Sequence, residues 1–125
     1  MNLREVSKAF GGIVLYGEEL LDQMDIEYAY GADLMSDVLA FAKPGSLLLT
    51  GLTNVQIIRT SQMLDIPAVI FVRGKRPREE TVKLAESLKM PVLLSPKSMF
   101  ETCGLLYKAG VLPCNIPSRE AKVED

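Results

Sequence analysis

Histidine is absent from this chain of 125 residues, and its absence removes several classes of catalytic site. Histidine is the usual general acid or base near neutral pH, the base of Ser-His-Asp and Cys-His arrangements, and a common ligand of zinc and iron. An enzyme built on this sequence would have to use carboxylates, lysine, tyrosine or an imported cofactor. No cofactor-binding or metal-binding motif is found, so we expect neither.

Membrane-spanning and redox signatures are also missing. No apolar run approaches the roughly 18 residues that cross a bilayer, and residues 1–10 lack the apolar core of a signal peptide. The two cysteines, Cys103 and Cys114, form no CxxC pair, and we expect both to remain thiols. The formal net charge of −2 gives no general attraction to nucleic acid or to a membrane. We therefore expect a cytoplasmic protein that binds neither.

The length and the composition, 48% hydrophobic and 24% charged, are those of one globular domain. We expect a single domain over residues 1–112 and a polar tail over residues 113–125. In the first part of the domain, apolar spacing and glycine stops indicate the following order: a helix at 2–10, a strand at 13–16, a loop or short helical turn at 18–24, and a strand at 25–30.

After Gly31 the pattern becomes regular. Asp33 is the expected cap of a helix over 34–42, and three strand–helix units follow it. The strands are expected at 46–50, 68–72 and 92–95, and the helices at 53–64, 78–89 and 98–109. Thr53 with Gln56, and Ser98 with Glu101, have the spacing of capping boxes. Because the strands are apolar on both faces, the sequence predicts an α/β three-layer sandwich with a mostly parallel sheet of about five strands.

Right-handed crossovers place all three strand-to-helix loops, 50–54, 73–78 and 95–98, at one edge of such a sheet. Ligands of open α/β sheets bind at this edge, where helix N-termini favour anions. The predicted ligand-binding residues are Thr50, Gly51, Thr53, Asn54, Arg73, Gly74, Lys75, Arg76, Ser95 and Ser98.

Two of these loops allow more than one interpretation. The segment TGLTN, residues 50–54, is either a tight turn with a helix cap or a cradle for a phosphate or carboxylate, and it matches neither common nucleotide-binding glycine motif. The segment RGKRPR, residues 73–78, carries four positive charges in six residues at a helix N-terminus, which prefers anions. A bound anion, an acidic partner surface, or the following Glu79 and Glu80 would each compensate these charges.

Other candidate chemical groups have simpler interpretations. Cys103 shares a helical stripe with Met99 and Leu106 and is expected to be a small core residue, whereas Cys114 is expected to be exposed in the tail. The carboxylate pairs Asp33/Asp37 and Glu18/Asp22 are spaced to bind a divalent ion, but they fit helix caps and surface charges as well.

The segment from Gly31 to Gly110 resembles the DRTGG domain, which is similar to the N-terminal domain of HPr kinase/phosphorylase. The resemblance covers about residues 1–112. In that family the domain occurs within some phosphotransacetylases and within CBS-containing pyrophosphatases, and catalysis lies in other domains of those proteins. The resemblance therefore implies a role in regulation or assembly. Leu52-Thr53 stands where the family has Asp-Arg, and Val72-Arg73-Gly74 where it has Thr-Gly-Gly, so a site formed by those motif residues is altered here.

Three functions follow as hypotheses. The first is a non-catalytic regulatory or adaptor module, acting as a homodimer, that binds a small anionic, nucleotide-like ligand or a partner protein at the loop edge. The second is a purely structural homodimerisation domain. The third is a small enzyme of carboxylate or lysine chemistry that uses Asp33, Asp37 or Lys97.

Overall fold

Short apolar runs alternate with helical periodicity along the chain, and each becomes a strand or a helix. The structure, a computed structural model, describes residues 1–116. Its elements in chain order are α1 (Leu3–Phe10), β1 (Ile13–Tyr16), the 3-10 helix η1 (Glu18–Gln23), β2 (Tyr28–Gly31), α2 (Met35–Phe41), β3 (Leu47–Thr50), α3 (Val55–Met63), β4 (Val69–Phe71), α4 (Glu79–Ser87), β5 (Val92–Leu94), α5 (Met99–Ala109) and β6 (Leu112–Pro113).

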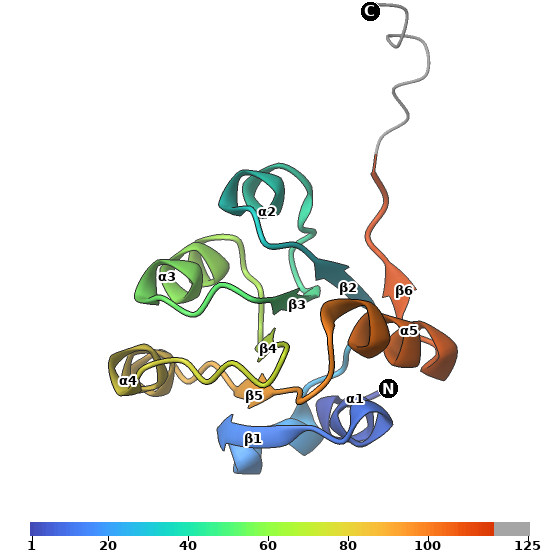
Figure 1. The fold of residues 1–125 in the computed structure, drawn as a ribbon, viewed down its shortest axis with the longest axis horizontal. Helices are drawn as coiled ribbons and strands as arrows, with labels where there is room; N and C mark the ends of the chain where they lie inside the picture. The colour runs from blue at the N-terminus through green and yellow to red at the C-terminus, as the bar shows by residue number, and fades with distance from the viewer. Residues whose placement is uncertain (117–125) are drawn as a thin grey trace, which may run out of the picture.

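The strands form one sheet in the order β1-β5-β4-β3-β2-β6. Strand β1 runs antiparallel to β5, and every other pair of neighbours is parallel. Helices α2, α3 and α4 cover one face of the sheet, and α1 and α5 cover the other (Figure 1). The predicted α/β sandwich with a mostly parallel sheet is therefore confirmed, with six strands in the described residues.

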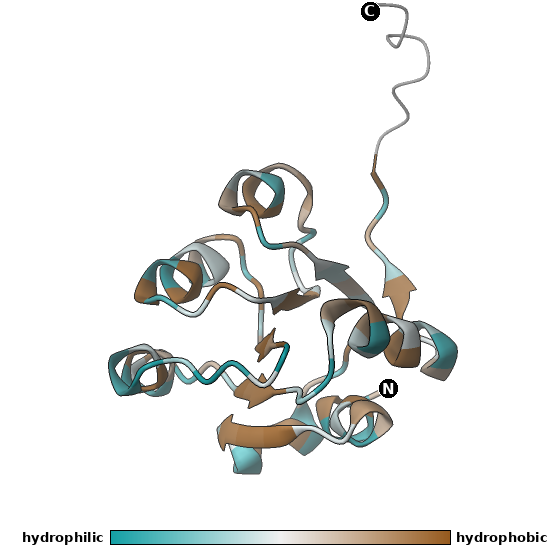
Figure 2. Ribbon diagram, in the orientation of Figure 1, coloured by the Kyte–Doolittle hydropathy of each residue, from teal (hydrophilic) through white to brown (hydrophobic). Residues whose placement is uncertain are grey.

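The central strands hold the two layers of helices together because side chains along a strand alternate between its faces. Leu49, Ile70 and Leu93 point into the core shared with α1 and α5. Leu48 and Phe71 point into the core shared with α2, α3 and α4. All five side chains are 0–1% exposed. Figure 2 shows the corresponding hydrophobic centre, with the hydrophilic parts of the helices facing outward.

Of the three helix caps predicted above, that of Ser98 is confirmed and the other two are wrong. Asn2 caps α1 in a full capping box, and Ser98 caps α5 by accepting from the Glu101 N–H. Helix α3, however, is capped by Asn54, whose side chain accepts from the Ile57 N–H at 3.2 Å, and not by Thr53. Helix α2 begins at Met35, and its N-cap residue is Leu34, which forms no side-chain cap, so Asp33 does not have the capping role expected of it.

The chain remains part of the sheet beyond the expected domain end at residue 112. Pro113 lies in β6 opposite Ala29, and the amides on either side of it, those of Leu112 and Cys114, donate to the carbonyls of Glu27 and Ala29. Proline is tolerated there because an edge strand has an outward side with no partner strand. The remainder of the expected polar tail, residues 117–125, lies outside the described residues.

The lengths of the helices show whether any of them could cross a membrane. Among the described residues no helix combines the length and the apolar character needed to cross a bilayer, and α5 has 11 residues.

The cap of α3 gives a stability test. We expect Asn54→Ala to lower the free energy of unfolding by about 1 kcal/mol, because it removes the oxygen that satisfies the Ile57 N–H. Thr53→Ala is the matched control and should cost less than half as much, since the bond that Thr53 accepts from the Thr81 hydroxyl uses its backbone carbonyl. Urea denaturation measures both. An equal loss in the two variants would contradict the assignment of the cap to Asn54.

Candidate functional site

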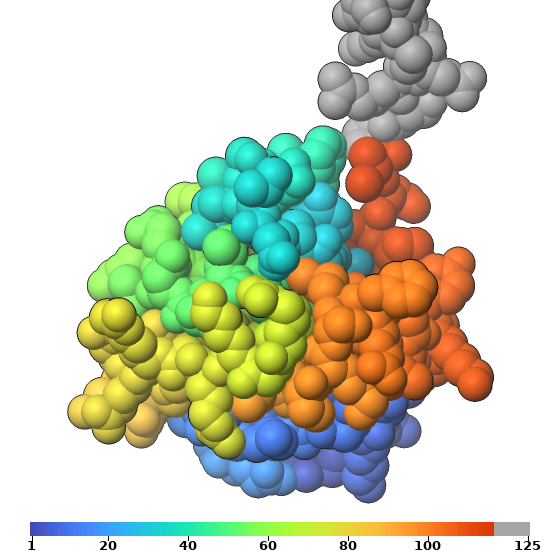
Figure 3. All heavy atoms as spheres, in the orientation of Figure 1, coloured from blue at the N-terminus to red at the C-terminus, as the bar shows by residue number. Residues whose placement is uncertain are grey.

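The three strand-to-helix loops lie at one edge of the sheet, as their parallel strands require. Two backbone hydrogen bonds join the loops after β4 and β5: the Arg73 N–H donates to the Lys97 carbonyl and the Gly74 N–H to the Ser95 carbonyl, both at 2.8 Å. The loop after β3 is joined to α4 by the Thr81 hydroxyl, which donates to the Thr53 carbonyl at 3.0 Å. Figure 3 looks onto this edge, with the segment after β4 between those after β3 and β5.

Arg73 has an unusual backbone conformation at this edge. Its φ is 65°, in the left-handed region, and Gly74 follows with the same φ of 65°. A side chain with a Cβ adopts this conformation at a cost of order 1 kcal/mol, whereas glycine adopts it freely. The two hydrogen bonds to the loop after β5 hold the backbone of Arg73 and Gly74 in this conformation.

The Arg73 side chain reaches across to Gly51. A Cβ built on Gly51 would lie 2.7 Å from the Arg73 Nη2 and 3.1 Å from the Asp33 Oδ1. Asp33 itself accepts a hydrogen bond from the Gly51 N–H at 2.7 Å. A guanidinium and a carboxylate thus lie on one buried glycine, which has room for them only because it lacks a side chain.

Within the described part of the chain the cationic loop has no ion-pair partner, and the carboxylate near it is that of Asp33, which lies on the same glycine as the Arg73 guanidinium. Over residues 1–116, none of the four cations Arg73, Lys75, Arg76 and Arg78 forms an ion pair, and all four are exposed. Glu79, one of the two carboxylates offered above as one way to compensate the loop, lies 3.9 Å from the Lys83 Nζ on its own helix. The loop therefore presents positive charge to solvent beside the N-terminus of α4.

Three of the four hydroxyl groups predicted for the site, those of Thr50, Ser95 and Ser98, form hydrogen bonds inside the protein. Ser95 is fully buried, and its Oγ lies 2.7 Å from the Thr102 Oγ1 and accepts from the Lys97 N–H at 3.2 Å. Thr50 is also buried, and its Oγ1 accepts from the Leu52 N–H. Ser98 caps α5. These side chains shape the loops, and the outward-facing chemistry of the edge comes from the cations.

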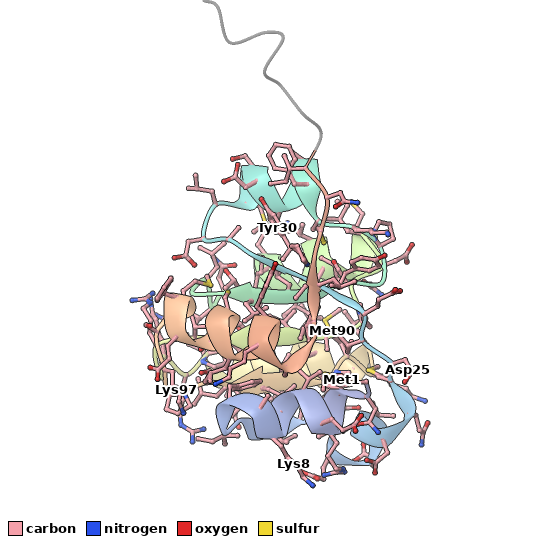
Figure 4. The ribbon with its side chains drawn as sticks, turned by 90° about the vertical axis from the view of Figure 1, so that its right-hand side faces the viewer. Met1, Lys8, Asp25, Tyr30, Met90 and Lys97 are labelled. Atoms are coloured by element: carbon pink, nitrogen blue, oxygen red, sulfur yellow. The ribbon has the colours of Figure 1, made fainter. Side chains whose placement is uncertain are left out.

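Lys97, considered for enzyme chemistry, and the pair Glu18 and Asp22, considered for a divalent ion, have structural contacts. Lys97 donates from Nζ to the Phe10 carbonyl at 3.1 Å, at the C-terminal end of α1, where a positive charge is favourable (Figure 4). Glu18 and Asp22 each accept a bond of 2.6 Å from Arg4. No cluster of three carboxylate or cysteine side chains suited to a metal ion occurs among the described residues.

Both cysteines lie beside a cavity that the sequence did not predict. Its volume is about 230 Å³, and it lies between β2, β6 and α5. Burial raises the pKa of the half-buried Cys103 thiol, which disfavours the thiolate. Cys114, expected to be exposed, is 6% exposed and lines the same cavity. The missed signal was Leu112, an apolar residue one position before the proline taken as the start of a tail.

A second hollow, of about 750 Å³, lies at the opposite edge of the sheet. It is lined by the start of β2 and by the turn before β3, where the Lys43 Nζ lies 3.9 Å from the centre of the Tyr28 ring. No predicted site residue lines it.

The contact between Asp33 and Gly51 gives a second stability test. We expect Asp33→Ala to lower the free energy of unfolding by about 1 kcal/mol, because it leaves the buried Gly51 N–H without its acceptor. Asp33→Asn, which keeps an acceptor oxygen, should recover most of the loss, and Asp37→Ala serves as the control. Chemical denaturation, with the Gly51 amide followed by NMR, measures the effect. Equal losses for Asp33→Ala and Asp37→Ala would refute a specific role for Asp33.

Comparison with known proteins supports this fold. A solved structure of the CBS and DRTGG domains of the regulatory region of Clostridium perfringens pyrophosphatase, complexed with the activator diadenosine tetraphosphate, superposes with a TM-score of 0.68 at 18% sequence identity. The match covers 90% of this chain and 47% of that chain, so this protein spans about half the length of the structure that it resembles. No curated protein sequence matches it.

The sequence profile of the DRTGG domain matches residues 5–109, from the first turn of α1 to the last residue of α5. The resemblance expected from the residues is confirmed, and the match extends over all the strand-to-helix loops described above. This chain belongs to the DRTGG domain family.

Proposed function

We propose that this chain is a non-catalytic regulatory module that binds a small polyphosphate or nucleotide-like anion at the loop edge. The observation that carries the proposal is the position of Arg73. Its guanidinium lies over Gly51, where the loops after β3, β4 and β5 come together, and it forms no ion pair within residues 1–116. Three further cations follow within five residues.

The conformation of Arg73 supports a ligand-binding role over a purely structural one. The resemblance to the family places a glycine of the Thr-Gly-Gly motif at this position, and glycine adopts a φ of 65° without strain. Arginine is strained there, and it contributes a planar donor group suited to phosphate oxygens. Strained residues are retained where the surrounding structure holds them and where they serve a function.

The class of ligand follows from charge and from the structural neighbour. A cluster of exposed cations beside a helix N-terminus favours ligands with several negative charges. The similar pyrophosphatase region was solved with a dinucleoside polyphosphate activator. We infer the same chemical class for this chain, with Lys75 and Arg76 contacting outer phosphates and Gly74 allowing close approach of the backbone.

A second candidate function, a structural homodimerisation domain, is favoured by a different observation. Phe100 and Tyr107 on α5 are 89% and 69% exposed, which is unusual for large apolar side chains. The two functions are compatible, because these residues lie outside the cationic loop.

Anion binding is tested by isothermal titration calorimetry with diadenosine tetraphosphate, ATP and inorganic triphosphate. We expect binding that weakens as salt rises, and an affinity at least about tenfold lower in Arg73→Gly, because a charge-assisted hydrogen bond contributes more than about 1.4 kcal/mol. Arg73→Gly should unfold with a free energy no lower than that of the unaltered protein, since glycine relieves the strain at φ 65°.

Arg59→Ala is the control. It removes an equal charge from an exposed position on α3 and should leave the affinity unchanged. The proposal fails if none of the three anions binds at millimolar concentration, or if Arg59→Ala weakens binding as much as Arg73→Gly does.

A further inference from the structure

One flank of α5 is apolar and open to solvent. Phe100, Gly104 and Tyr107 recur at the spacing that places residues on one side of a helix. Phe100 is 89% exposed, Tyr107 is 69% exposed, and no atom lies within 4 Å of a Cβ built on Gly104. Figure 4 shows α5 and β6 turned toward the viewer, and none of the other helices and strands of residues 1–116 lies in front of α5. This flank is called the α5 ridge below.

The cavity of about 230 Å³ lies directly beside the α5 ridge. Tyr107 belongs to both, and Cys103 and Leu106 form the helix wall of the cavity, opposite β2 and β6. The cavity has a simple cause. The sheet has six strands about 4.8 Å apart, whereas each helix is only about 10 Å across. Two helices, α1 and α5, are therefore too narrow to cover the whole of their face, and part of it is left uncovered at β2 and β6.

Phe100 and the cavity match each other in size and chemistry. The lining is almost entirely apolar, and it includes Leu49, Val111 and Leu112. An apolar cavity of about 150 Å³ holds one benzene ring, so a cavity of this size has room for a phenyl side chain. The exposed ring and the unfilled cavity are on the same surface of one molecule.

The charges of α5 are self-complementary. Glu101 lies in the first turn and Lys108 in the last, and both are exposed on the same side of the helix, next to Gly104. When two such helices run antiparallel with residue 104 at the crossing point, residue 100 faces residue 107 of the other copy on one flank, and residue 101 faces residue 108 of the other copy on the other flank. Each Glu101 then lies next to the other copy's Lys108, and each Phe100 next to the other copy's Tyr107.

We propose that two copies of this chain associate through the α5 ridge, with their α5 helices antiparallel and Gly104 at the two-fold axis. Phe100 of each copy packs at the mouth of the cavity of the other, and Glu101 pairs with the partner's Lys108. Gly104 lets the helices approach closely. An isologous interface requires each partner to carry both complementary parts, and this surface carries the ring, the cavity and both charges.

The proposal assigns a surface to the homodimer and does not depend on anion binding at Arg73. Sedimentation equilibrium on the full chain tests it. The unaltered protein should be a dimer, and Phe100→Ser should raise the dimer dissociation constant at least about tenfold, as expected for a central aromatic contact. Met63→Ser is the control: Met63 is 67% exposed, lies on the opposite face of the sheet, and should leave the constant unchanged.

The antiparallel arrangement has its own test. Glu101→Lys and Lys108→Glu should each weaken the dimer, because each places like charges together across the two-fold axis. The double variant restores opposite charges and should recover most of the lost affinity. A monomeric unaltered protein, an unchanged constant in Phe100→Ser, or a double variant weaker than both single variants would overturn the proposal. Calorimetry with triphosphate on Phe100→Ser separates the two proposals, since anion binding should persist there.

Discussion

The rest of the structure depends on the burial of both faces of the three central parallel strands. Leu48, Leu49, Ile70 and Phe71 alternate between two cores, so a shift of one residue in any strand would bring core side chains to the wrong side. Because β3, β4 and β5 pair in parallel and in fixed register, the three strands end at the same edge of the sheet, and the loops that follow them begin side by side. The contact of Arg73 with Gly51 is a consequence of that alignment.

The loop edge separates two kinds of polar group. Hydroxyl groups such as those of Ser95 and Thr102 are buried and bonded to each other, and they fix the shape of the loops. Apart from the Arg73 side chain, which reaches across to Gly51, the cations of residues 73–78 are exposed and form no ion pair within residues 1–116. A family with this fold can therefore change the charge and length of the outer residues while it keeps the inner hydroxyl contacts. Arg73, which stands where the resemblance places a glycine of the Thr-Gly-Gly motif, is a change of this kind, whereas the neighbouring Val72 is part of the core.

The sequence predicts most of the fold because each strand–helix unit carries its own signals of periodicity, proline and glycine. It does not predict which of two adjacent capping residues is used. Thr53 and Asn54 are both good caps, and the path of the chain out of β3 selects Asn54. The sequence also suggests that Asp33 caps the helix that follows it. Its actual partner is the Gly51 N–H, which only the pairing of β2 with β3 brings near. The cavity beside α5 was missed for a related reason. Its existence depends on how many helices fall on each face of the sheet, which no local pattern records.

The strand order has a consequence for how the chain reaches its native state. Strand β1 is the first strand to be made, yet it pairs with β5, about 80 residues later in the chain, so closing this contact is entropically expensive. The parallel pairs β2–β3, β3–β4 and β4–β5 each join consecutive strands and close shorter loops. During synthesis the central sheet can therefore assemble strand by strand. Helix α1, which packs against α5, and β1 are docked onto it only after the last third of the domain has emerged.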